Sequence, residues 1–170
     1  MANQGVAAVK VEVLAHQLEV SRGSFYWHFK NRRELLEEIL KRWETETLWL
    51  IEESQQETTP EARLIKMFAL AEELCNLPDP EAAIFIWANQ ESRVQERVRI
   101  VETRRVNYLN QLLQDYGFDE IEARQKAEIG YFAFMGFWER RERDKKFDLS
   151  IKDFGKLLID LLLSPVRERK

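Results

Sequence analysis

Apolar residues recur every three or four positions along most of the chain, which is the spacing of one face of an α-helix. After Asn31, the residues at these intervals are Leu35, Leu36, Ile39, Leu40, Trp43 and Leu50. No segment shows sustained alternation of apolar and polar residues, and the hairpin dipeptides Asn-Gly and Asp-Gly do not occur. The pattern therefore predicts an all-α protein.

Capping residues and prolines mark where the predicted helices begin. Thr59-Pro60-Glu61 and Asp79-Pro80-Glu81 each place a capping side chain before a proline at the first helical position. Asn31 and Glu34 have the spacing of a capping box, which predicts a long helix from Asn31. Two further helices are expected at residues 119–143 and 150–163, the first of them after a glycine at 117 that is typical of a C-cap.

Two short helices joined by a turn are expected between residues 10 and 29. The first has an apolar face formed by Val11, Leu14, Ala15 and Leu18. Ser21 can cap the second, over residues 21–29, with Val20, Phe25 and Phe29 pointing inward. The side chains left outside are Arg22, Ser24, Tyr26, Trp27 and His28. This is the geometry of a helix-turn-helix, whose second helix enters the major groove of DNA.

Charge is distributed unevenly, although the net charge is only −4. Residues 1–33 hold five basic and two acidic side chains, a net charge of +3. The other 137 residues hold 21 basic and 28 acidic side chains, a net charge of −7. A basic module before an acidic body is expected if only one end of the chain meets a polyanion.

Several classes of protein are disfavoured by what the chain contains. Cys75 is the only cysteine, and His16 and His28 are the only histidines, so a structural zinc site is not expected. Both histidines fall in the proposed DNA-binding segment, which leaves no catalytic triad, so neither catalysis nor a cofactor is expected. The longest stretch without charge is ten residues, against about 20 for a membrane span. With no export signal at the start, a cytoplasmic location without membrane attachment is predicted.

The segment from Leu14 to Leu36 reads LAHQLEVSRGSFYWHFKNRRELL. It resembles the DNA-binding signature of the tetracycline-repressor (TetR) family of bacterial transcriptional regulators, with SRGSFYWHFK as the recognition helix. The resemblance implies that Arg22, Gly23 and Trp27 face bases and that the other matching positions contact the DNA backbone. The DNA-binding residues expected are Lys10, Arg22, Gly23, Ser24, Tyr26, Trp27, His28, Lys30 and Arg33.

The chain departs from the family's pattern in two ways. Glu19 stands where the family usually has a glycine in the turn, and a non-glycine residue at positive φ costs about 1 kcal/mol. The chain also begins at about the end of the helix that opens the family's DNA-binding domain. An alternative therefore stays open, in which the protein is a helical ligand-binding or interaction dimer that has lost DNA binding.

The resemblance implies a DNA-binding domain at 1–45 and a helical ligand-binding and dimerisation domain at 46–170. The implied function is a ligand-responsive repressor that binds double-stranded operator DNA and a small-molecule effector. Aromatic residues predicted to line the effector pocket are Phe85, Trp87, Tyr108, Tyr131, Phe134 and Trp138, although the same residues fit an ordinary core.

A homodimer is predicted because two recognition helices must meet successive major grooves. Its interface is expected on two apolar seams, formed by Ala127, Gly130, Phe134 and Phe137 and by Ile151, Phe154, Leu158, Leu161 and Leu162. The interface residues selected are Ala127, Gly130, Phe137, Phe154, Leu158, Leu161 and Leu162. The alternative is that both seams pack within one subunit.

Overall fold

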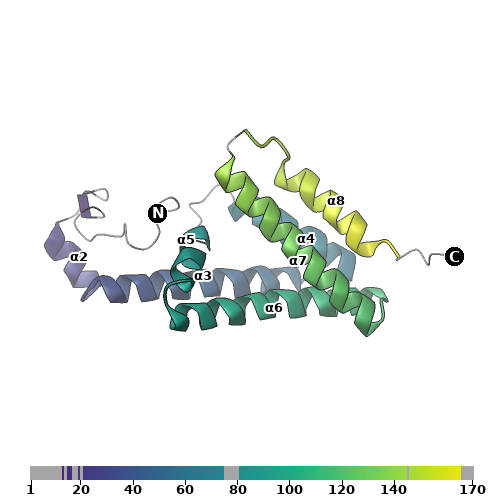
Figure 1. Ribbon diagram of the computed structural model, residues 1–170, viewed down its shortest axis with the longest axis horizontal. Helices are drawn as coiled ribbons and strands as arrows, with labels where there is room; N and C mark the ends of the chain where they lie inside the picture. The colour runs from purple at the N-terminus through teal and green to yellow at the C-terminus, as the bar shows by residue number, and fades with distance from the viewer. Residues whose placement is uncertain are drawn as a thin grey trace. The chain divides into compact units, whose positions relative to one another are not determined.

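The computed structural model describes residues 13, 15, 16, 19, 21–74, 81–144 and 146–165. The side chains of Arg22, Leu74 and Glu142 lie outside that description. All regular elements among the described residues are α-helices, so the predicted all-α class is confirmed. The helices are α2 (Arg22–His28), α3 (Arg32–Ser54), α4 (Pro60–Leu74), α5 (Glu81–Ala88), α6 (Ser92–Tyr116), α7 (Glu120–Arg143) and α8 (Ile151–Leu163) (Figure 1).

The helix ends at Gly117, Asp119 and Ser150 lie where the capping residues predict them, whereas Asp79 and Pro80 lie outside the described residues. The Asp119 carboxylate accepts hydrogen bonds from the backbone N–H groups of Ile121 and Glu122, and the Ser150 hydroxyl accepts one from Asp153. Gly117 ends α6 with a φ of 124°, a left-handed conformation that favours glycine. These local contacts satisfy backbone groups that a helix end would otherwise leave unpaired.

The chain divides into two compact units, and the boundary falls inside α3 and inside α6. The first unit contains Met1–Thr47 and Pro78–Val101, and the second contains Leu48–Leu77 and Glu102–Lys170. The core of the first unit joins α3, α5 and α6, and consists of Leu36, Leu40, Trp43, Ile84, Trp87, Ala88, Val94, Val98 and Val101. The predicted boundary between functional domains at 45 and 46 stays a prediction.

In the second unit, α8 packs against α4 and α7 (Figure 1). The contact with α4 depends on Gly155, because a Cβ at this position would lie 2.8 Å from ring atoms of Phe68. On α7, a Cβ at Gly130 would lie 3.0 Å from Leu162 and 3.1 Å from Leu109. Both glycines therefore allow helices of the same subunit to approach closely.

The residues selected for the dimer interface lie mostly inside this unit. Those buried within the single chain are Ala127, Gly130, Phe137, Leu158 and Leu162, and Phe154 is half-buried against Phe68 and Phe137. They pack within the single chain, and their assignment to the dimer interface stays a prediction. Leu161 is the exception, with 70% of its surface exposed.

No helix within the described ranges is both long and apolar enough to span a membrane.

Candidate nucleic-acid interface

Helix α2 has one side anchored in the protein and one side in solvent. The Ser21 hydroxyl caps the helix by accepting a hydrogen bond from the Ser24 N–H at 3.0 Å. Phe25 is buried, and its ring contacts Tyr26 and Phe29 at centroid distances of 5.7 and 5.3 Å. The predicted inward direction of Phe25 is thus confirmed, and Phe29 is half-buried. Val20 lies outside the described residues.

The opposite side of α2 is open to solvent. Trp27 is 82% exposed and Tyr26 is 45% exposed, while Ser24 and His28 are also exposed. The His28 ring meets the Trp27 ring edge-on at 4.7 Å. The neighbouring rings of Trp27 and His28 thus leave an aromatic surface open to a partner.

Gly23 lies on this exposed side, and no contact with the described residues requires a glycine there. A Cβ added at Gly23 would meet only the Ser21 hydroxyl oxygen, at 3.6 Å, an ordinary van der Waals distance. Glycine weakens a helix interior by up to about 1 kcal/mol relative to alanine. Its presence in a seven-residue helix is therefore not explained by packing.

The turn before α2 contains the predicted strain. Val13, Ala15 and His16 are helical, and the N–H of Glu19 donates a hydrogen bond to the His16 carbonyl at 3.2 Å. Glu19 has a φ of 54°, which confirms that this position has the left-handed conformation usually filled by glycine. The predicted residue Lys10 and the side chain of Arg22 lie outside the described part of the chain.

The junction of α2 and α3 is closed by a capping box with one change. Asn31 accepts a hydrogen bond from the N–H of Glu34 at 3.0 Å, as predicted. The Glu34 carboxylate accepts from the N–H of Lys30 and reaches one residue further back than the motif requires. Lys30, Arg32 and Arg33 are exposed around this cap, beside the positive end of the helix dipole.

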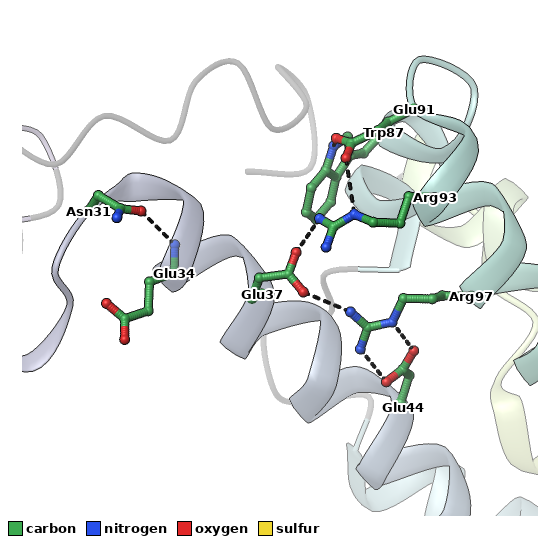
Figure 2. Close-up of polar contacts among 8 residues, drawn as sticks. All are labelled: Asn31, Glu34, Glu37, Glu44, Trp87, Glu91, Arg93 and Arg97. Atoms are coloured by element: carbon green, nitrogen blue, oxygen red, sulfur yellow. Dashed lines mark hydrogen bonds and ion pairs between the residues drawn. The ribbon is translucent and has the colours of Figure 1, made fainter.

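A chain of charged residues ties α3 to α6 in the first unit, and the sequence pattern alone did not reveal it (Figure 2). The Arg97 guanidinium pairs with Glu44 at 2.6 Å and with Glu37 at 3.0 Å. Arg93 pairs with the other oxygen of Glu37 and with Glu91. The indole N–H of Trp87 on α5 donates to Glu91 at 2.8 Å. The available sequence signal was weak: Glu37 and Glu44 are seven residues apart on one helix face.

These contacts shift the pKa values of Glu37 and Arg97. Burial acts to raise the pKa of Glu37, but hydrogen bonds and charge from Arg93 and Arg97 outweigh it, so this pKa is lowered. The hydrogen bond with Glu44 is the largest influence on Arg97 and raises the pKa of its guanidinium. Glu37 and Arg97 are therefore both held in their charged forms.

The predicted effector residues fall into separate groups. Phe85 and Trp87 pack in the first unit, where Phe85 meets Trp43 edge-on at 6.3 Å. In the second unit, the hydroxyl of Tyr108 lies 2.6 Å from that of Ser54, and the hydroxyl of Tyr131 donates to Glu102 at 3.2 Å.

The remaining two residues, Phe134 and Trp138, stack on each other at 5.9 Å in the second unit. Phe68 meets Phe134 edge-on at 6.1 Å and Phe154 at 6.3 Å. Phe154 in turn stacks on Phe137 at 4.1 Å. Phe134 and Trp138 are thus members of a larger aromatic cluster that also contains Phe68, Phe137 and Phe154.

A short helix with one anchored side and one exposed side, followed at once by a long helix, is the arrangement expected of the second helix of a helix-turn-helix. Residues 1–39 match the family model described as "Bacterial regulatory proteins, tetR family". This N-terminal segment is therefore similar to the TetR family, as the sequence resemblance implied.

Two solved structures share the fold. The transcriptional regulator FadR from Bacillus subtilis in complex with stearoyl-CoA aligns with a TM-score of 0.65 and 17% identity, over 98% of this chain and 93% of that one. The ketosteroid transcriptional regulator KstR2 of Mycobacterium tuberculosis aligns with a TM-score of 0.59 and 19% identity, over 95% and 86%. No curated protein matches the chain in sequence.

Proposed function

We propose that this protein is a dimeric, ligand-responsive repressor that binds operator DNA through α2. The observation that carries the proposal is the division of α2 into a buried side around Phe25 and an exposed side around Tyr26 and Trp27. An exposed aromatic and polar helix face followed by the basic residues Lys30, Arg32 and Arg33 is what a major groove and its phosphates accept. In this proposal Arg22, Gly23 and Trp27 face bases, and Lys10, Ser24, Tyr26, His28, Lys30 and Arg33 contact phosphates.

Gly23 gives the sharpest test, because a substitution there should affect protein stability and DNA affinity in opposite directions. Gly23→Ala should leave thermal stability unchanged or raise it, since a Cβ there has space and alanine favours the helix. If the backbone of Gly23 approaches bases closely, the same variant should bind DNA more weakly. Thermal unfolding and DNA binding are measured on one preparation, with Ser24→Ala as the neighbouring control for loss of a phosphate contact. Unchanged affinity in Gly23→Ala would refute the close approach.

The salt dependence of binding tests DNA recognition as a whole. The DNA is a duplex selected by the wild-type protein from a randomised pool. Affinity should fall with salt at a slope of about −0.9 per phosphate contact. Lys30→Ala should weaken binding to all duplexes alike, and Arg22→Ala should relax the preference for the selected site. Failure of the wild-type protein to select any duplex would favour the alternative, an interaction dimer that does not bind DNA.

The dimer is proposed to form through apolar side chains that the single chain leaves exposed. On α7 these are Ile121, Ile129 and Phe132, and on α8 they are Leu157 and Leu161, each between 56% and 72% exposed. The residues of each helix recur at three- and four-residue multiples, so each helix carries one exposed stripe. Stripes on two helices of each copy suit a four-helix bundle. Among the residues selected from sequence, Leu161 remains in this proposal.

The effector is proposed to be largely apolar and to bind among the aromatic side chains of the second unit. The fold neighbour FadR is described in complex with stearoyl-CoA, and aromatic residues from α4, α7 and α8 lie together in this chain. Stearoyl-CoA should raise the thermal midpoint and release the selected duplex, whereas free CoA should do neither. Trp138→Ala should reduce the thermal shift, and equal shifts with both ligands would contradict an apolar site.

A further inference from the structure

The ion pairs between α3 and α6 form a continuous series that is more protected from solvent at its Glu44 end than at its Glu91 end. It runs from Glu44 through Arg97, Glu37 and Arg93 to Glu91, and each guanidinium lies between two carboxylates (Figure 2). The side chains of Arg97 and Glu44 are 25% and 24% exposed, whereas that of Arg93 is 51% exposed. Protected, forked contacts to carboxylates are stronger and more directional than exposed single ones. Arg97 is therefore the main electrostatic link between the two helices.

The geometry of these pairs fixes more than the distance between the helices. Arg93 contacts Glu37, and Arg97, one turn later, contacts both Glu37 and Glu44. The contacts advance in the same direction on both helices, so α3 and α6 run parallel here. A guanidinium that bridges residues seven apart on α3 resists sliding of one helix along the other, because either shift would break one of the two pairs.

The DNA-reading helix is attached to the end of α3 that this series holds. Only Phe29, Lys30 and Asn31 separate α2 from α3, and the Asn31–Glu34 cap closes that junction. Glu37 lies one turn beyond the cap. A displacement of α3 against α6 would therefore carry α2 with it.

We infer that Arg97 is a positioning residue for DNA recognition, which holds α3, and through it α2, in one register against α6. The inference rests on the proposed DNA-binding function. Arg97 touches no DNA in this scheme, so its loss should not remove a phosphate contact. Its loss should instead make the position of α2 less well defined, and a dimer with loosely held reading helices tolerates operators whose half-sites are wrongly spaced.

The experiment measures discrimination between half-site spacings in the full-length protein. The wild-type protein is titrated with its selected duplex and with the same duplex carrying one extra central base pair, and the ratio of the two affinities is the readout. In Arg97→Gln this ratio should fall by roughly threefold to tenfold, as expected for a forked, half-buried ion pair. The slope of affinity against salt should not change, because the number of phosphate contacts is the same.

Arg99→Gln is the matched control. Arg99 lies on the same helix and pairs locally with Glu96 at 2.6 Å, three residues away. Its removal changes the net charge by the same amount as the Arg97 variant and should leave the spacing ratio at the wild-type value. Arg97→Lys retains the charge without the fork and should give an intermediate ratio. Glu44→Gln, which keeps the guanidinium, should also lower the ratio and serves if Arg97→Gln fails to fold.

The outcomes separate this inference from the function on which it rests. If the wild-type protein selects no duplex, the proposed DNA-binding function fails. If it selects a duplex and Arg97→Gln and Glu44→Gln discriminate spacing as the wild type does, DNA binding stands and the positioning role is refuted. Equal losses in Arg97→Gln and Arg99→Gln would also refute it, because a general effect of charge would explain both.

Discussion

Truncation of Phe132 should separate the dimer into folded monomers. Phe132 is 65% exposed in the single chain, on the α7 stripe proposed to meet a second copy. Complete burial of a phenylalanine side chain contributes roughly 1.5 to 3 kcal/mol, so burial of the exposed part contributes about 1 to 2 kcal/mol. Two-fold symmetry repeats the substitution, and Phe132→Ala should weaken the dimer by about 2 to 4 kcal/mol. The dissociation constant should rise by roughly 30-fold to 700-fold.

Sedimentation across a range of protein concentrations measures this constant, and circular dichroism establishes that the monomer keeps its helices. Ile65→Ala is the control, because Ile65 is 53% exposed on α4 and lies outside the stripes. This control should dimerise like the wild type. A folded Phe132→Ala protein that dimerises as tightly as the wild type would refute the assignment of this surface, as would a wild type that stays monomeric at every concentration.

Three other predictions concern stability. Glu19→Gly should raise the thermal midpoint by about 2 to 4 °C, because it relieves a positive φ that costs on the order of 1 kcal/mol; a lower midpoint would contradict this. Gly155→Val should lower stability by about 1 to 3 kcal/mol in denaturant titrations, since its side chain overlaps Phe68, and an unchanged midpoint would show that α4 and α8 can separate. Because the pKa of Glu37 is lower in the folded protein, its ionised carboxylate stabilises the fold at pH values above the ordinary glutamate pKa of about 4.3. This stabilisation is lost as the pH falls through the pKa that Glu37 has in the folded protein. Glu37→Gln should therefore be less stable at neutral pH and show a shallower fall of the thermal midpoint on acidification, and a fall as steep as that of the wild type would exclude this role.

Helix ends could be predicted from sequence because the interactions that make them are local. Asp119, Ser150 and Asn31 each accept hydrogen bonds from N–H groups two or three residues ahead, and Gly117 adopts the positive φ that its place after Tyr116 implied. The buried and exposed sides of α2 could also be predicted from local sequence. A two-turn helix has few apolar residues, and burial of Phe25 fixes which side faces the protein.

The faces of α7 could not be assigned in this way, because the helix is apolar on two sides. Ala127, Gly130 and Phe137 recur at helical spacing, and so do Ile129 and Phe132. Periodicity identifies both stripes but does not show which of them packs on α8. In the structure it is the stripe with Ala127, Gly130 and Phe137, because Gly130 lets Leu162 of α8 approach closely. The ion pairs of Arg97 were hidden for another reason: their partners lie 53 and 60 positions away in the chain.

The exposure of Trp27 also means that intrinsic tryptophan fluorescence can report on the reading surface. The chain has five tryptophans, and the indole rings of Trp43 and Trp87 are only 3% and 7% exposed. Water around an 82% exposed ring shifts its fluorescence to longer wavelength, so the signal from Trp27 is spectrally distinct from that of the buried rings. A duplex that covers the ring would displace this water, and occupancy of the reading surface becomes visible in unlabelled protein.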